Sequence, residues 1–188
     1  TSHSLSSGAT LDPTTGYTYQ VDAQDAQGRI YRKQGSFTTR NVRLEVQLTG
    51  LQITDDSDFL GAGELRAQLH LGTTKTWIWQ NEKSVETASG SKYFPLTTSA
   101  ALPSAVRTVP IHVVVSDDDC EGIGSLCTGG LGDLSVGSGS NSDAQWATAT
   151  FTATLPNTTT TTQWNSFISS ANSPVGFIVT GSYRWVMV

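Results

Sequence analysis

Apolar and polar residues alternate along several stretches of this chain, and the clearest stretch covers residues 41–49. Its even-numbered positions from Val42 to Leu48 are apolar, and the positions between them are polar. Side chains of a strand point to opposite faces in turn, so a period of two predicts a half-buried antiparallel strand. The strand runs directly into Asp55 and Asp56.

The same alternation predicts further strands. They are expected at residues 17–21, 29–37, 65–71, around Trp77 and Trp79, 109–115, 146–155 and 175–188. Residues 1–16 are polar and are expected to form a flexible lead-in. Residues 163–171 are the exception to the period of two, because apolar residues fall there at i, i+3, i+4 and i+7, which predicts one or two helical turns.

Six to eight strands in one chain indicate an all-β protein. The 188 residues suit one domain, and alternating strands without long helices favour an antiparallel β-sandwich. We therefore expect residues 1–188 to form a single sandwich of about eight strands with one short helix.

The charge of the chain is low and unevenly distributed. Charged residues make up 14% of the sequence and the formal net charge is −5. No cluster of Lys and Arg is present, which argues against nucleic acid as a partner. Half of the sixteen acidic residues lie in two short stretches, each directly after a strong strand. They are Asp55, Asp56, Asp58 and Glu64 in the first stretch and Asp117, Asp118, Asp119 and Glu121 in the second.

Two acidic loops at strand ends predict a cation site. Strand ends of a sandwich gather at its two poles, so the two loops can meet at one pole. Carboxylates held about 4–6 Å apart repel one another, and a cation removes that cost. Ca²⁺ takes six to eight oxygen ligands, whereas Mg²⁺ keeps several waters. Either stretch alone favours a solvated turn, because Asp, Ser and Gly are turn residues, and the pair together favours calcium.

The acidic stretches do not form an EF-hand. Asp56, Asp58 and Gly61 fit its first positions, but the last position is Ala67 where a glutamate is required, and the flanks are strands. "TDDSDFLGAGELRAQL" and "VSDDDCEGIGSLCTGGLGDL" instead resemble the calcium loops of C2-like domains. The resemblance covers about residues 41–155. It implies a β-sandwich with calcium loops at one end and matches Asp117, Asp119 and Asp133 to ligand positions.

The sequence departs from the C2 pattern at two points. Glu64-Leu65-Arg66 stands where Asp-Pro-Tyr is usual, and an insertion with both cysteines lengthens the second loop. The proposed ligands are Asp55, Asp56, Asp58, Glu64, Asp117, Asp118, Asp119 and Asp133. Cys120 and Cys127 fit a local disulfide better than a zinc or C-x-x-C motif. A disulfide implies an oxidising compartment, so we expect a secreted, extracellular or periplasmic protein.

The sequence contains no nucleophile-elbow, metalloprotease or phosphate-loop motif, so it leans away from an enzyme.

His70 and His112 fall on the polar registers of their strands and are expected at the surface. Trp77 and Trp79 are two residues apart and are expected to share a face. These two residues and Trp146 are candidates for stacking on sugar rings, although a core role is favoured.

The function predicted from these residues is a secreted, calcium-binding β-sandwich that acts as a binding or accessory domain. A carbohydrate-binding module with structural calcium is one alternative. A structural subunit of a surface or shell assembly is another. The partner is a glycan, a membrane surface or another protein, and the sequence does not decide among them.

Overall fold

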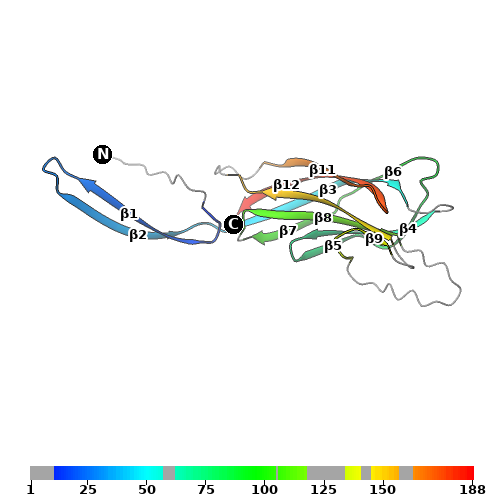
Figure 1. The fold of residues 1–188 in the computed structure, drawn as a ribbon, viewed down its shortest axis with the longest axis horizontal. Helices are drawn as coiled ribbons and strands as arrows, with labels where there is room; N and C mark the ends of the chain where they lie inside the picture. The colour runs from blue at the N-terminus through cyan, green and yellow to red at the C-terminus, as the bar shows by residue number, and fades with distance from the viewer. Residues whose placement is uncertain (1–10, 57–61, 105, 118–133, 141–144, 157–162) are drawn as a thin grey trace.

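The computed structural model describes residues 11–56, 62–104, 106–117, 134–140, 145–156 and 163–188 (Figure 1). All regular structure in these ranges is β-strand, and no helix there is long and apolar enough to cross a membrane. The strands are β1 (Gly16–Gln24), β2 (Ile30–Thr38), β3 (Val42–Asp55), β4 (Gly63–Leu71), β5 (Thr74–Val85), β6 (Lys92–Pro95), β7 (Ser99–Ser104), β8 (Thr108–Asp117), β9 (Gly139–Ser140), β10 (Gln145–Thr154), β11 (Asn165–Ala171) and β12 (Gly176–Met187).

The strands form three antiparallel sheets. Among the described strands, β1 and β2 pair only with each other, and we call this hairpin the arm. The other strands form the body, in two sheets. One sheet has the order β11-β12-β3-β6, with β7 also paired to β3, and the other has the order β5-β4-β8-β10-β9. The expected all-β class with antiparallel sheets is confirmed.

One hydrophobic core lies between the two body sheets. The first sheet contributes Leu44, Leu48, Phe177 and Trp185, all 1% exposed or less. The second sheet contributes the apolar register of β4 and β8, where Leu69 is directly opposite Val113. The alternation seen in the sequence is therefore the alternation between core and outer face.

β3 changes register in its middle. Its even positions up to Leu48 are buried, and beyond that point the buried residues are Leu51 and Ile53. Pairing with β12 shows the cause, because Thr180 is opposite Gly50 and Gly181 is opposite Leu48, so Thr49 is the extra residue of a bulge. The bulge lets one strand continue for 14 residues with its apolar side chains still facing the core.

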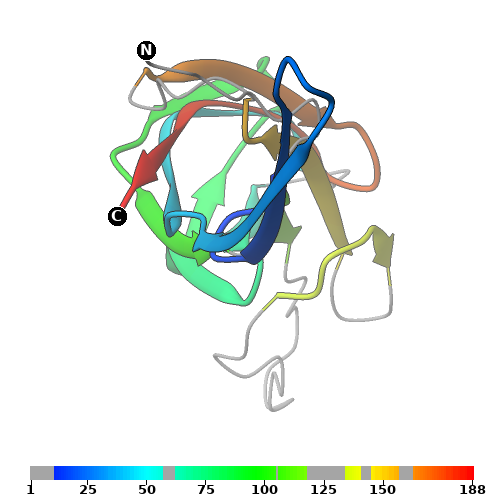
Figure 2. The same cartoon turned by 90° about the vertical axis from the view of Figure 1, so that its left-hand side faces the viewer.

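The arm lies at the opposite end of the molecule from Asp55 and Asp117, the described strand ends at which the acidic stretches begin. β3 leaves the arm at Val42 and ends at Asp55. β8 starts after Arg107, whose Nη1 donates to Leu11 O at 2.9 Å near the root of the arm, and ends at Asp117. Figure 1 shows the arm projecting from one end of the body, beside the C-terminus, and the view along the molecule in Figure 2 places it in front of the body sheets.

Two predictions about the fold are wrong. The expected helix at residues 163–171 is strand β11, in which Phe167 and Ala171 face inward and Ile168 is 68% exposed. Pairing with β12 supplies backbone hydrogen bonds that outweigh the helical spacing of a few apolar residues. The described ranges also contain twelve strands rather than about eight. The extra ones include the arm strands and the short β6, β7 and β9.

Candidate functional site

Asp56 and Asp117, which belong to the described parts of the two acidic stretches, meet at one end of the body. Gly63, the first residue of β4, lies between Asp56, which follows β3, and Asp117, the last residue of β8. A Cβ atom added to Gly63 would be 3.0 Å from Asp117 Oδ1 and 3.1 Å from Asp56 Cβ. It would also be 2.8 Å from the backbone oxygen of Asp56, so only glycine allows this approach. We call this end the acidic pole.

The strand registers explain why the two aspartates come together. Asp117 continues the inward register of β8 and is directly opposite Leu65 of β4 and Gln145 of β10. It is 0% exposed, and Asp56 is 2% exposed. Asp56 follows a strand of one body sheet and Asp117 ends a strand of the other, so the two carboxylates close the end of the core from both sides.

The carboxylate of Asp56 also holds a loop in place. Its Oδ2 accepts a hydrogen bond from Thr87 N at 2.9 Å, and its Oδ1 accepts one from Thr87 Oγ1 at 2.9 Å. The same hydroxyl accepts the backbone N–H of Asp56 at 3.3 Å. Asp56 therefore joins the end of β3 to the connection after β5, and each carboxylate oxygen keeps one further lone pair for another donor or a cation.

The other predicted ligands fall into two groups. Asp55 is exposed opposite Gly176, and Glu64 is half-buried opposite Ser84. Asp58, Asp118, Asp119 and Asp133 lie outside the described residues, as do Cys120 and Cys127. Within the described ranges, no group of three or more His, Cys, Asp and Glu side chains is close enough to hold a metal ion. Those ranges bring together two of the eight proposed ligands at Gly63.

The tryptophans are arranged differently from the prediction. Trp77 is opposite Gln68 and Trp79 is opposite Ala67, so a register shift at Ile78 places the two indoles on different faces. Trp79 packs against the core and meets Phe94 edge-on at 5.0 Å between ring centroids. The expectation of a shared face is therefore wrong, because it assumed an unbroken strand.

Trp146 lies on the outer face of its sheet, close to β9. An added Cβ on Gly139 would be 2.7 Å from Trp146 Cζ2, so the backbone of the paired β9 strand covers part of the ring. The indole is half-buried. Of the three proposed stacking residues, Trp77 is thus the one that neither packs into the core nor lies against β9.

The outer face of β4 is buried, which the sequence did not reveal. Arg66, Gln68 and His70 are 7%, 0% and 4% exposed. Gln68 Oε1 accepts the backbone N–H of Leu134 at 3.0 Å, so the segment that follows the long Gly/Ser-rich stretch lies across this face. The prediction that His70 is a surface residue is therefore wrong. Alternation along β4 showed which residues face outward, but no signal in that strand indicated a covering segment.

Gln68 links the covering segment to His70. Its Oε1 is 2.8 Å from His70 Nε2, and because an amide oxygen only accepts, that ring nitrogen carries the proton. His112 lies directly across from His70 on β8, and its Nδ1 is 2.9 Å from Thr150 Oγ1. Partial burial lowers the pKa of His112, which favours its neutral form.

A comparison with protein-family models found no match, and a comparison with curated proteins found none either. The function is therefore inferred from the residues and contacts of this chain.

Proposed function

We propose that this chain is a calcium-stabilised, C2-like β-sandwich that acts as a binding or accessory domain through its acidic pole. The observation that carries the proposal is the meeting of Asp56 and Asp117 against Gly63. The sequence interpretation required the two acidic stretches to share one end of the fold. Placement at opposite ends would have left two unrelated turns.

The burial of these two residues supports a cation. Asp56 and Asp117 are each 2% exposed or less. Two carboxylates brought close together and withdrawn from water repel each other unless positive charge or hydrogen-bond donors offset their charge. Thr87 supplies two donors to Asp56. A calcium ion would offset negative charge at this pole, and its flexible coordination suits ligands from several loops.

The residues of this pole are hard oxygen donors, which fit calcium. Asp56 and Asp117 would hold the ion together with Asp55 or Glu64 from the same strand ends. The acidic residues outside the described ranges would complete the six to eight ligands that calcium takes. When bound, the ion would contribute charge neutralisation and tie the two loops together, and the fixed loops would present a surface to a partner.

Thermal unfolding with and without calcium tests the proposal. A hundredfold excess of Ca²⁺ over its Kd stabilises a protein by about 2.7 kcal/mol, which for this length corresponds to a Tm increase of about 5–10 °C. We expect that increase in the native chain and its reversal by a chelator. Asp55→Asn, an exposed substitution that leaves the core intact, should reduce the calcium-dependent part of the shift.

Asp22→Asn is the matched control, because Asp22 lies in the arm at the far end of the molecule. Its calcium-dependent shift should equal that of the native chain. Titration calorimetry with CaCl₂ on the same three proteins measures binding directly. Identical melting curves in calcium and chelator, together with no heat of binding, would show that the acidic pole is not a calcium site.

The class of partner is tested separately. Calcium-dependent sedimentation with anionic vesicles would assign the pole to a membrane surface. Glycan-array binding that is lost in Trp77→Ala and retained in Trp79→Phe would favour the carbohydrate-binding alternative, since Trp77 is the indole outside the core. The disulfide between Cys120 and Cys127, and the oxidising compartment that it implies, remain proposals from the sequence.

A further inference from the structure

The arm has one apolar face and one polar face. Strand pairing places alternate residues of β1 and β2 on each side. The apolar face consists of Tyr17, Tyr19, Val21, Ala23, Tyr31, Lys33, Gly35 and Phe37. Tyr17 stacks on Phe37 with 5.7 Å between ring centroids, and the Tyr19 ring lies over Gly35, within 2.5 Å of where a Cβ would stand.

The opposite face of the arm already has polar partners. Gln34 Nε2 donates to Gln20 Oε1 at 2.9 Å, and Arg32 Nε donates to Asp22 Oδ1 at 2.9 Å. The polar face is thus suited to water. The apolar face is not, because Tyr19, Tyr31 and Phe37 are 44%, 55% and 44% exposed.

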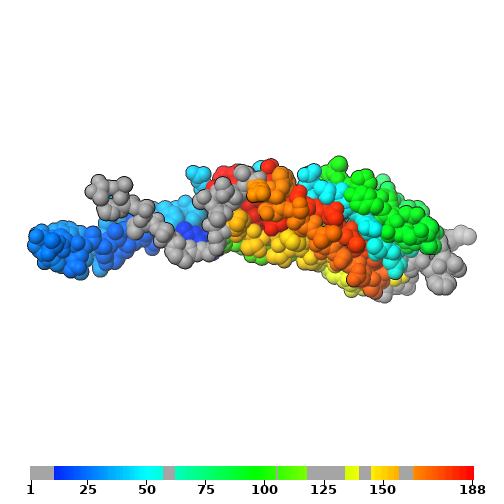
Figure 3. Space-filling model, turned by 90° about the horizontal axis from the view of Figure 1, so that it is seen from above, coloured from blue at the N-terminus to red at the C-terminus, as the bar shows by residue number. Residues whose placement is uncertain are grey.

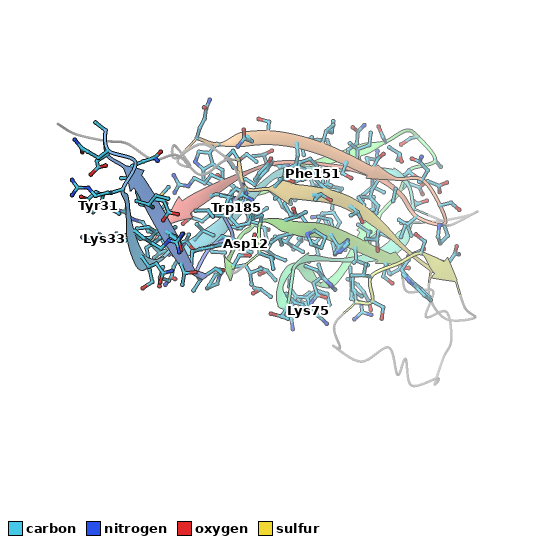
Figure 4. All side chains as sticks on the ribbon, turned by 60° about the vertical axis from the view of Figure 1, so that its left-hand side comes forward. Asp12, Tyr31, Lys33, Lys75, Phe151 and Trp185 are labelled. Carbon is cyan, nitrogen blue, oxygen red and sulfur yellow. The ribbon has the colours of Figure 1, made fainter. Side chains whose placement is uncertain are left out.

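An isolated two-stranded hairpin is marginally stable in water, and among the described residues no third strand or body sheet pairs with the arm. Figure 3 shows the arm as a narrow extension beyond the body, and Figure 4 shows Tyr31 and Lys33 on it, apart from the side chains of the body. Three half-exposed aromatic rings on such an extension indicate a surface that a partner covers.

We propose that the apolar face of the arm binds the same face of a second copy of this chain, with the two arms antiparallel about a twofold axis. A twofold interface uses one patch on both copies, so the patch must complement itself. Antiparallel arms place the two bodies at opposite ends, which separates their negative charge. Residues 41–188 carry thirteen acidic and seven basic side chains.

The residues of the face complement one another in this arrangement. A twofold axis through the middle of the face sets Tyr17 opposite Ala23 and Tyr19 opposite Val21, so each large ring meets a small side chain. On β2, Phe37 meets Tyr31, an aromatic pair of the kind that stabilises interfaces. Lys33 meets Gly35, where the Tyr19 ring lies, and a lysine over a tyrosine ring is favourable.

The root of the arm offers room for the tip of the partner's arm. Antiparallel pairing brings each tip, where Ala23 and Tyr31 lie on the apolar face, to the other copy's root, which is the end of the arm next to the body. A pocket of about 420 Å³ lies there, and Val42, Pro103 and Val188 are among its lining residues. Val188 is 68% exposed, and a second chain bound at this pocket would also bury its side chain.

The available area fits a weak dimer. Each of the three half-exposed aromatic rings leaves about 100 Å² of its surface in contact with water. With the rest of the apolar face, the area that a partner can cover is roughly 500 Å² per arm. Two arms would hide about 1,000 Å², which is the lower limit for a specific interface. We therefore expect association at micromolar concentrations rather than a permanent dimer.

Sedimentation equilibrium of the full chain from about 1 to 300 μM tests the proposal. The weight-average mass should rise from that of the 20.0 kDa chain towards twice that value. Tyr31→Ser combined with Phe37→Ser should raise Kd more than about tenfold, since buried aromatic residues dominate interfaces. Gln20→Ser combined with Gln34→Ser, on the polar face, is the matched control and should dimerise like the native chain. Dimerisation should persist in chelator, which separates this proposal from the calcium proposal.

A cross-link locates the interface by position. A mixture of Tyr17→Cys chains with Ala23→Cys chains should be joined between positions 17 and 23 by a bismaleimide reagent that spans about 10 Å, the spacing of sheets packed face to face, and mass spectrometry maps the joined positions. A mixture of Thr18→Cys with Gln24→Cys chains, on the polar face, should not be joined. A constant monomer mass up to 300 μM, or a dimer unaffected by the Tyr31 and Phe37 substitutions, overturns the proposal. If the chain stays monomeric and sediments with phosphatidylcholine vesicles, the apolar face of the arm binds a lipid surface instead of a second copy.

Discussion

The arm and the body are built from the same kind of strand, yet their apolar faces have opposite surroundings. β1 and β3 both alternate apolar and polar residues. In β3 the apolar residues from Val42 to Leu48 are at most 6% exposed, whereas Tyr19 in β1 is 44% exposed. Alternation therefore shows which side chains share a face of a strand. What covers that face depends on other parts of the chain or on a partner.

The difference has an energetic meaning. A buried face contributes stability in proportion to the apolar area withdrawn from water, so the body should carry nearly all the free energy of unfolding of the monomer. The arm depends on its turn, its cross-strand pairs and any partner. The same substitution should thus have different effects in the two regions.

The largest effect is expected from phenylalanine truncation. Phe177→Ala removes a ring that is 0% exposed between the body sheets, and such a change costs about 3–5 kcal/mol. Phe37→Ala, on the arm, should change the free energy of unfolding of the monomeric body by less than about 1 kcal/mol. Urea unfolding followed by tryptophan fluorescence measures the body, since all five tryptophans lie beyond the arm. Equal losses in the two variants would mean that the arm folds as part of the core.

A smaller effect is expected from the two aspartates that hold loops. Asp56→Ala leaves the N–H and hydroxyl of Thr87 without their acceptor and should cost about 1–3 kcal/mol. Asp25 accepts the backbone N–H groups of Gln27 and Arg29 at 3.0 and 2.9 Å in the turn of the arm. Asp25→Ala should leave the Tm of the body unchanged.

Thr87→Val completes a double-mutant cycle with Asp56→Ala. The double variant should lose less stability than the sum of the single variants, because the second change removes groups that the first has already left unpaired. Additive losses would show that Asp56 acts through something other than Thr87.

The smallest effect is expected from surface ion pairs and their pH dependence. The hydrogen bond from Arg184, and next to it the one from Arg43, hold the pKa of Glu45 below its usual value of 4.5. A lowered pKa in the folded state stabilises the fold above the usual pKa and loses this contribution as pH falls through the folded value. Glu45→Gln should cost under about 1 kcal/mol at pH 7 and make stability less dependent on pH below about 5.

The arm again supplies the comparison. Arg32 lowers the pKa of Asp22 through a side-chain hydrogen bond, but the Asp22 side chain is exposed. Asp22→Asn should leave the pH dependence of the Tm of the body as it is in the native chain. A flatter profile for Asp22→Asn and an unchanged one for Glu45→Gln would reverse the assignment of the two ion pairs.

The body strands with a period of two were predictable from sequence. β8 and β12 were located within two residues at each end. The prediction for β3 stopped at Thr49, whereas the strand continues to Asp55, because the bulge at Thr49 shifts its register. Strand β11 was mistaken for a helix, since Phe167 and Ala171 fit both periods and Ile168 is apolar but exposed. This segment is a strand because it pairs with β12, whose partner residues lie at most 18 positions further along the chain.

The site was predictable in part. Aspartates at the ends of two strong strands indicated a shared pole, and Asp56 and Asp117 do meet at Gly63. The contact of Asp56 with Thr87 depends on a loop 31 residues further along the chain, for which local sequence has no signal. The same holds for the register shift that separates Trp77 from Trp79 and for the cover over His70, because both arise from pairing between distant segments.

The opposite placement of the arm and the acidic pole has a consequence for avidity. Two copies joined through their arms would carry the two poles at the outer ends, facing away from each other. Such a dimer would present two equivalent binding surfaces at a fixed separation. On a surface with repeated ligands, the second contact would form at a high effective concentration and strengthen binding without any new residue. On an isolated ligand the two poles would act independently.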